Sequence, residues 1–178
     1  LGYEIHCRMG DHIALRRLLL KEGAECGIRE FGFNALLSLR LEKGFGIWSA
    51  EFTQGYTPGM TGMDRWIDWE KEKFIGQAAA IKERDGNGPA QKLVMLEIDA
   101  DDADASGYEP VWNNDSLVGF VTSGGYGHTL KKSLAMALVN NDLANENQRL
   151  KVHVVGVEKD AKVIQASPYD PEGSVMRV

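Results

Sequence analysis

Apolar positions in the first half of the chain recur mostly at helical spacing. Between Asp11, a suitable N-cap, and Gly23, a suitable stop, they predict a helix that buries one face. Asn34 and Gly44 bound a second predicted helix in the same way, because asparagine caps a first turn and glycine adopts the left-handed conformation after a last turn. An alanine-rich stretch predicts a third helix over residues 77–84.

Three short segments of the first half are predicted to be extended, namely residues 3–7, 45–52 and 63–69. Strands that alternate with helices indicate a small mixed α/β segment of ferredoxin-like type, with its helices on one face of a sheet. The glycines and proline of residues 85–89 form the strongest breaker cluster in the chain. We therefore expect a domain boundary there.

After Pro89 the pattern changes to short strands separated by turns. Their number and spacing predict a small antiparallel barrel or sandwich. The fold class is thus α+β, with one domain over residues 1–88 and a second, C-terminal domain over residues 89–178. The predicted strands of the second domain are residues 92–98, 107–112, 117–122, 133–139, 150–157 and 162–166.

Composition narrows the classes of function. The 178 residues are 43% hydrophobic with a net charge of −6, and they contain no Lys/Arg-rich run, which argues against a nucleic-acid partner. No apolar run approaches the roughly 20 residues needed to cross a bilayer, and no signal peptide is visible. Two cysteines, Cys7 and Cys26, do not make a disulfide framework. We expect a soluble protein of the cytoplasm, or of the mitochondrial matrix in a eukaryote.

A few polar residues are candidates for chemistry. Arg40 and Glu42 are charges set among leucines at the end of the second predicted helix, where the helical pattern favours an exposed, ion-paired face. His128 is a lone histidine that follows a glycine-rich stretch without the spacing of a dinucleotide-binding loop. The aspartates of residues 99–104 lack the spacing of a calcium loop, and no zinc-ligand spacing occurs. The residues alone therefore predict no metal site and no catalytic residue.

Several motifs resemble one family along nearly the whole chain. SLRLEKGF followed by Trp48, GYEI at the start, TPGMTGMDRWIDWEKEKFIG, SGGYGHTLKKSLAMALV and SPYDPEG resemble segments of the glycine-cleavage T-protein (aminomethyltransferase) superfamily. The EKG form is most similar to the dimethylglycine and sarcosine dehydrogenase branch. Met60 stands where that family usually has a glutamate, and Leu36 replaces an arginine that T-proteins use for folate. The resemblance implies that the C-terminal domain is a β-barrel.

The resemblance also implies a cofactor and a site. Family members bind tetrahydrofolate and transfer a one-carbon unit to it, here from a methylated amine. Glu4, with Tyr3 beside it, matches the glutamate that hydrogen-bonds the pterin ring. Arg40 is the third folate-binding candidate, since it could hold the folate carboxylate, although it could equally pair with Glu42, and a structural role is favoured. The catalytic acid and any FAD site of the family lie upstream of the matching segments, so the chain is interpreted as the C-terminal part of a longer enzyme, inactive alone.

Two alternatives remain open. One is a folate-dependent demethylase of a sulfonium or methoxy substrate on the same fold, which the identity of the methyl donor would distinguish. The other is a non-catalytic folate-binding protein of the iron–sulfur maintenance kind. Those proteins carry a cysteine in a KGC-type motif, whereas Phe45 follows Lys43-Gly44 here and no cysteine occurs after Cys26. This last alternative is therefore ranked lowest.

Overall fold

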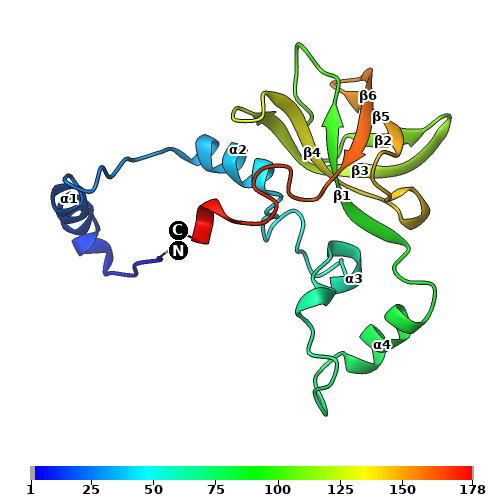
Figure 1. Ribbon diagram of the computed structural model, residues 1–178, viewed down its shortest axis with the longest axis horizontal. Helices are drawn as coiled ribbons and strands as arrows, with labels where there is room; N and C mark the ends of the chain where they lie inside the picture. Colours follow the sequence, from blue (N-terminus) through cyan, green and yellow to red (C-terminus); the bar gives the residue numbers. More distant parts are fainter. Residues whose placement is uncertain (1–2, 178) are drawn as a thin grey trace.

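A computed structural model describes residues 3–177 and shows helices followed by a closed β-barrel (Figure 1). The four α-helices are α1 (His12–Glu22), α2 (Phe33–Lys43), α3 (Pro58–Thr61) and α4 (Gln77–Asp85). The six strands are β1 (Gln91–Ile98), β2 (Pro110–Asn113), β3 (Ser116–Gly127), β4 (Lys132–Asn140), β5 (Arg149–Val154) and β6 (Val157–Ile164). Short 3₁₀ turns cover Met9–Asp11, Asp64–Trp66, Asn141–Leu143 and Val175–Arg177. The α+β class and the C-terminal barrel are confirmed.

The barrel closes in the strand order β1-β4-β3-β2-β5-β6, with every pair antiparallel. Alternate residues point inward, as the two-residue period of a strand requires, and form one apolar core. Its fully buried members include Leu96, Val111, Val121, Ala137 and Val152. Closure pairs every strand, so that no edge is left open.

Several strand boundaries differ from the sequence prediction, since β2 begins at Pro110 and not at residue 107, and β6 covers Val157–Ile164 and not residues 162–166. The segment predicted as one strand over residues 150–157 contains a hairpin, because Val155 and Gly156 both adopt positive φ angles, 50° and 78°, and turn the chain between β5 and β6. The β-branched Val155 rarely takes this conformation, so the sequence hides the turn. Strand β3 runs through Gly127, whereas the prediction ended it at residue 122.

The predicted helices are confirmed, with corrections at their caps. Helix α2 begins at Phe33 with Gly32 as its N-cap, so Asn34 lies inside the helix and does not cap it. Asp11 is the N-cap of α1 but makes no side-chain capping hydrogen bond. The buried face predicted for α1 is wrong for this chain, because no residue of α1 is buried.

The three strands predicted before residue 88 are not formed. Residues 3–7 and 45–52 have no strand partner, and residues 63–69 contain a 3₁₀ turn over Asp64–Trp66. A strand needs neighbours for its backbone hydrogen bonds, and within the described residues only the barrel strands supply one another with them. The described part of residues 1–88 is therefore helical and irregular, and the division at residues 88/89 remains a prediction.

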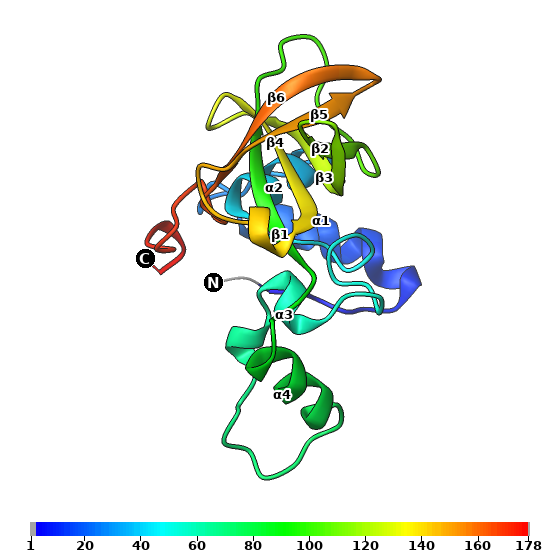
Figure 2. The ribbon, with the colours of Figure 1, turned by 90° about the vertical axis from the view of Figure 1, so that its right-hand side faces the viewer.

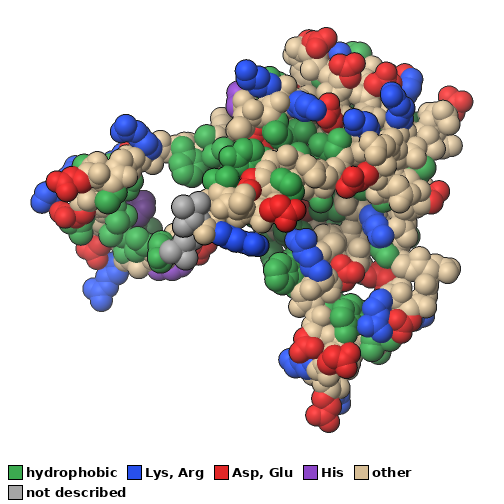
Figure 3. All heavy atoms as spheres, in the orientation of Figure 1, with side chains coloured by type: hydrophobic (Ala, Val, Ile, Leu, Met, Phe, Trp, Pro, Cys, Tyr) green, Lys and Arg blue, Asp and Glu red, His purple; other side chains and the backbone are tan. Residues whose placement is uncertain are grey.

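Residues 3–32, the first thirty that the structure describes, form what we call the N-terminal arm. Helix α1 stands apart from the barrel in Figure 1, and Figure 2 shows α3 and α4 below the barrel. Hydrophobic side chains lie at the surface of the arm and along α2 (Figure 3), among them Ile13, Leu18 and Phe33, which are more than half exposed. No helix among residues 3–177 is both long and apolar enough to cross a membrane.

Candidate functional site

Helix α2 is held against the outside of the barrel at its C-terminal end. Leu41 is 1% exposed and joins a second apolar cluster with Met95, Leu134 and Met136, which face outward from β1 and β4. Gly44 ends the helix with φ 74°, and a Cβ there would lie 1.9 Å from the carbonyl oxygen of Ala166. Only glycine fits this turn, as the sequence predicted.

Glu42 anchors the same helix through hydrogen bonds. Its Oε1 accepts from the backbone N–H groups of Thr129 at 2.7 Å and Leu130 at 2.8 Å, in the turn between β3 and β4. The side chain is 2% exposed, so the predicted exposed face is wrong at this position. A Cβ at Gly127 would lie 3.0 Å from the Glu42 side chain, which explains this glycine of the SGGYG segment by close packing.

Arg40 pairs with Glu51 and not with Glu42. Arg40 Nη1 lies 3.4 Å from Glu51 Oε2, and the two side chains are 9% and 0% exposed. Glu51 also accepts from the backbone N–H of Ile47 at 2.8 Å and from the hydroxyl of Ser123 on β3 at 2.5 Å. Burial lowers the pKa of Arg40, and the neighbouring carboxylate of Glu51 opposes that shift. The network ties α2, the loop after it and the barrel together.

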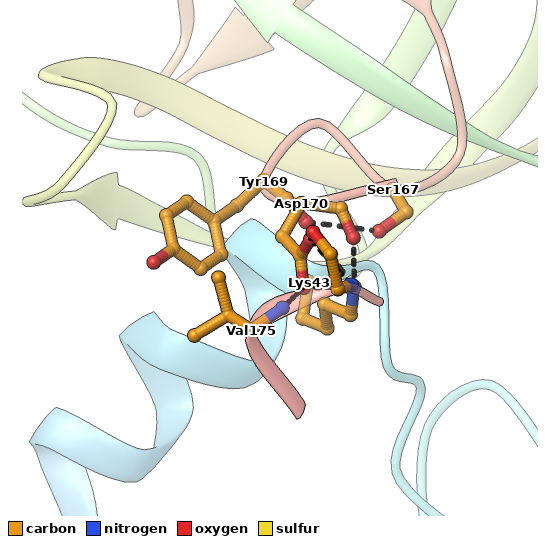
Figure 4. Close-up of polar contacts among 6 residues, drawn as sticks. Lys43, Ser167, Tyr169, Asp170 and Val175 are labelled. Carbon is orange, nitrogen blue, oxygen red and sulfur yellow. Dashed lines mark hydrogen bonds and ion pairs between the residues drawn. The ribbon is translucent and has the colours of Figure 1, made fainter. Parts of the chain in front are cut away.

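Lys43 holds the C-terminal segment over the end of α2 (Figure 4). Its ammonium donates to the backbone oxygen of Asp170 and lies 3.4 Å from the carboxylate of the same residue. Asp170 in turn accepts from the backbone N–H and the hydroxyl of Ser174 at 2.8 and 2.7 Å. These hydrogen bonds, with the Ser174 hydroxyl foremost and Lys43 contributing, lower the pKa of Asp170. The SPYDPEG segment is thus a strap that closes over α2.

We call Arg40, Glu42, Lys43 and Glu51 the anchor residues, because each joins α2 or its following loop to another part of the chain. Sequence reasoning singled out the first two as candidates for chemistry and missed Glu51. A signal for Glu51 exists: it is the one charge between Lys43 and Asp64 in the sequence. Its partner Ser123 lies 72 residues away, which no local pattern reveals.

The remaining predicted site residues lie in the N-terminal arm. Tyr3 is 82% exposed, and the Glu4 side chain is 91% exposed with His6 Nε2 3.7 Å away. No hydrogen bond or ion pair among residues 3–177 joins Glu4 to Arg40. The structure therefore places the three folate-binding candidates in two different settings, two in an exposed arm and one inside a buried ion pair.

The described residues contain no metal site. No three of their histidine, cysteine, aspartate and glutamate side chains gather as metal ligands would, and both cysteines are exposed thiols. His128 lies edge-on to the ring of Tyr126, with 5.1 Å between ring centroids. The loop of residues 99–104 points one carboxylate, that of Asp102, at Lys159.

Two family models match different parts of the chain. Residues 91–170 match the glycine cleavage T-protein C-terminal barrel domain, and residues 1–71 match the GCVT N-terminal domain. The first match contains all six strands, from Gln91 to Ile164, and the second contains α1, α2 and the anchor residues. The chain belongs to the glycine cleavage T-protein family.

Individual relatives agree with this assignment. The mitochondrial dimethylglycine dehydrogenases of Rattus norvegicus and Homo sapiens are each 36% identical, over 93% of this chain and 19% of their own length. The aminomethyltransferase of Geobacillus sp. (strain WCH70) is 32% identical over 94% of this chain and 46% of its own. The chain thus spans about a fifth of the dehydrogenases and just under half of the aminomethyltransferase.

A solved structure shows the same fold. The glycine cleavage system aminomethyltransferase T from Bartonella henselae superposes with a TM-score of 0.79 at 25% identity, covering 91% of this chain and 44% of that protein. The superposition includes the helical part as well as the barrel, because the barrel strands alone make up far less of the chain.

Proposed function

We propose that this chain is the folate-binding C-terminal part of an aminomethyltransferase or of a dimethylglycine dehydrogenase-like enzyme. The reaction is the transfer of a one-carbon unit from a methylated amine to tetrahydrofolate. Family membership supports the class of reaction, and two relatives at 36% identity are named dimethylglycine dehydrogenases. In a dehydrogenase-like protein the FAD would be bound upstream of the matched segment. Because the dehydrogenase relatives are mitochondrial, we expect a eukaryotic protein of this kind in the mitochondrial matrix.

The observation that carries the proposal is the exposure of the Glu4 carboxylate and its lack of hydrogen-bond donors among the described residues. Its carboxylate is 91% exposed, its one close charged neighbour is His6, and no described residue donates a hydrogen bond to it. Its oxygens are therefore available to two parallel N–H donors, such as those on the aminopyrimidine edge of a pterin ring. The residues present fit the cofactor at this position.

Each part of the chain has a distinct task in this proposal. When tetrahydrofolate is bound, it would supply the nitrogen that takes up the one-carbon unit. Glu4 orients the ring, with Tyr3 beside it. Apolar side chains of the arm and of α2 would help to exclude water once the rest of the enzyme covers them, which strengthens hydrogen bonds at the site. Arg40 serves the site indirectly, by fixing α2 on the barrel through Glu51.

Calorimetric titration with folinic acid tests the proposal on the full-length protein. Glu4→Gln keeps the shape of the side chain but presents a donor to a donor, and a hydrogen bond to a charged group is worth roughly 1.5–3 kcal/mol. We expect folinic acid affinity to fall about ten- to a hundredfold. Glu25→Gln, another exposed glutamate of the arm, is the matched control and should leave affinity unchanged. Equal affinities of the Glu4→Gln variant and the unaltered protein would contradict the proposal.

A further inference from the structure

A charged cleft of about 600 Å³ lies at one end of the barrel, and none of the anchor residues lines it. It is bounded by the end of β1, the beginnings of β4 and β5, the middle of β6 and the turn between β3 and β4. Four basic and four acidic side chains line it, so that its formal charges balance. Nothing in the proposed function uses this cleft.

Two of the basic side chains are placed directly against each other. Arg149 on β5 and Lys162 on β6 are opposite residues of the antiparallel pair, and neither forms an ion pair within residues 3–177. On the other side of β6, Lys162 lies opposite Glu97 of β1, but Glu97 Oε2 forms an ion pair with Lys132 Nζ at 2.6 Å. Like charges at directly opposite positions destabilise a strand pair, so this arrangement is unfavourable without an anion between the two side chains.

Two acidic side chains form a second group beside the first. The backbone N–H of Asp99, which directly follows β1, donates to the carbonyl oxygen of Asp160 on β6 at 2.8 Å, so the two residues lie side by side. Neither carboxylate forms an ion pair in the described part of the chain, and Lys151, opposite Asp160, pairs with Glu158 instead. Asp160 and Lys162 are two residues apart on one face of β6, so the basic and acidic groups are separated by about 7 Å.

Ser133, at the beginning of β4, borders the same cleft. Its side chain is 3% exposed and lies on the inward face of β4 with Ala135 and Ala137, so its hydroxyl belongs to the barrel interior and not to the face that carries Arg149 and Lys162.

We propose that this cleft binds a small zwitterion, such as an amino acid, that carries one carboxylate and one ammonium. The carboxylate lies between Arg149 and Lys162, and the ammonium points to Asp99 and Asp160. The carboxylate of the ligand neutralises the two basic side chains, and its ammonium neutralises the two acidic side chains. A singly charged ion would neutralise only one of these two pairs.

Nuclear magnetic resonance titration of the ¹⁵N-labelled protein tests the proposal with γ-aminobutyrate as the probe. Saturable shifts of the Ser133, Arg149 and Lys162 amide signals are expected. Acetate and butylammonium, which each carry one of the two charges, should bind at least tenfold more weakly. The absence of saturable shifts, or equal binding of acetate or butylammonium, would overturn the proposal.

Arg149→Gln provides a second test, in which the stability of the protein and its affinity for the probe should change in opposite directions. It removes the like-charge contact with Lys162, so the ligand-free protein should melt at a higher temperature while affinity for γ-aminobutyrate falls at least tenfold. Lys151→Gln is the matched control, since Lys151 lies two residues away on β5, is paired with Glu158 and does not line the cleft. This control should leave γ-aminobutyrate affinity unchanged. Wild-type affinity in Arg149→Gln would refute the site.

Discussion

Helices α1 and α2 are both eleven residues long and both rich in leucine, yet they have opposite surroundings. No residue of α1 is buried, whereas α2 ends in two buried residues, Leu41 and Glu42. The apolar content of the two helices does not explain this difference. What separates them is the set of anchor residues, which connect α2 to β3, to the β3–β4 turn and to the C-terminal strap.

The comparison teaches how polar residues fix a helix on a barrel. Apolar packing alone would let α2 slide or rotate on the surface of β1 and β4, because it is not directional. The carboxylates of Glu42 and Glu51 each accept from defined N–H or O–H groups and so select one orientation. The arm has no comparable contacts. Its exposed apolar side chains mark an interaction surface, which the proposed function assigns to the rest of the enzyme.

The largest effect should come from removing Glu51. Glu51→Ala leaves Arg40 buried without its carboxylate and Ser123 without its acceptor, and breaking such a buried pair costs about 3–5 kcal/mol. Urea denaturation followed by fluorescence should show a corresponding loss of unfolding free energy. Glu25→Ala, an exposed residue of the arm, should change that free energy by less than about 0.5 kcal/mol. A loss below 1 kcal/mol in Glu51→Ala would mean that the network does not hold α2.

One pair of leucines compares the two helices directly. Leu41→Ala on α2 should cost about 2–5 kcal/mol, since the residue is 1% exposed and its removal leaves a cavity beside Met95 and Met136. Leu18→Ala on α1 should cost less than about 0.5 kcal/mol, because that side chain is 54% exposed. Equal losses in the same denaturation experiment would show that both helices are packed alike.

A smaller effect should appear in the acid limb of the stability curve. The pKa of Asp170 lies below its ordinary value of 3.8, so the unfolded chain binds its proton more readily than the native protein does. The resulting stabilisation is complete well above pH 3.8, begins to fall near pH 3.8 and is lost as the pH falls through the native pKa. In Asp170→Asn this pH dependence should vanish. Parallel acid limbs for the two proteins would show that the strap does not depend on this carboxylate.

Much of the fold could be predicted from the sequence because its signals are local. The helical spacing around Leu41, the stop at Gly44 and the alternation in the barrel strands all act over a few residues. The strands predicted at residues 3–7 and 45–52 failed because a strand exists only with a partner, which alternation cannot supply. The turn at Val155 was missed because a β-branched residue takes a positive φ there against its preference.

The anchor residues show why a site is harder to predict than a fold. Glu42 and Thr129 are 87 residues apart, and Glu51 and Ser123 are 72 apart, so their contacts depend on the finished barrel. Reading Arg40 and Glu42 as neighbours on one helix suggested an exposed pair, whereas Arg40 pairs with the buried Glu51 and Glu42 binds the turn between β3 and β4. The family resemblance is confirmed by the comparisons, and the structure shows which groups Glu42, Lys43 and Glu51 contact.

Amide hydrogen exchange tests the central claim most directly, because it reports the local stability of α1 and α2 in the same molecule. The backbone N–H of Phe45 donates to Arg40 O, and that of Gly23 donates to Leu19 O, so each of these amides closes the last turn of its helix. If the anchor residues fix α2 on the barrel, Phe45 should exchange as slowly as amides of β1 and β4, and Gly23 at least a hundredfold faster. Similar rates for Phe45 and Gly23 would contradict the account.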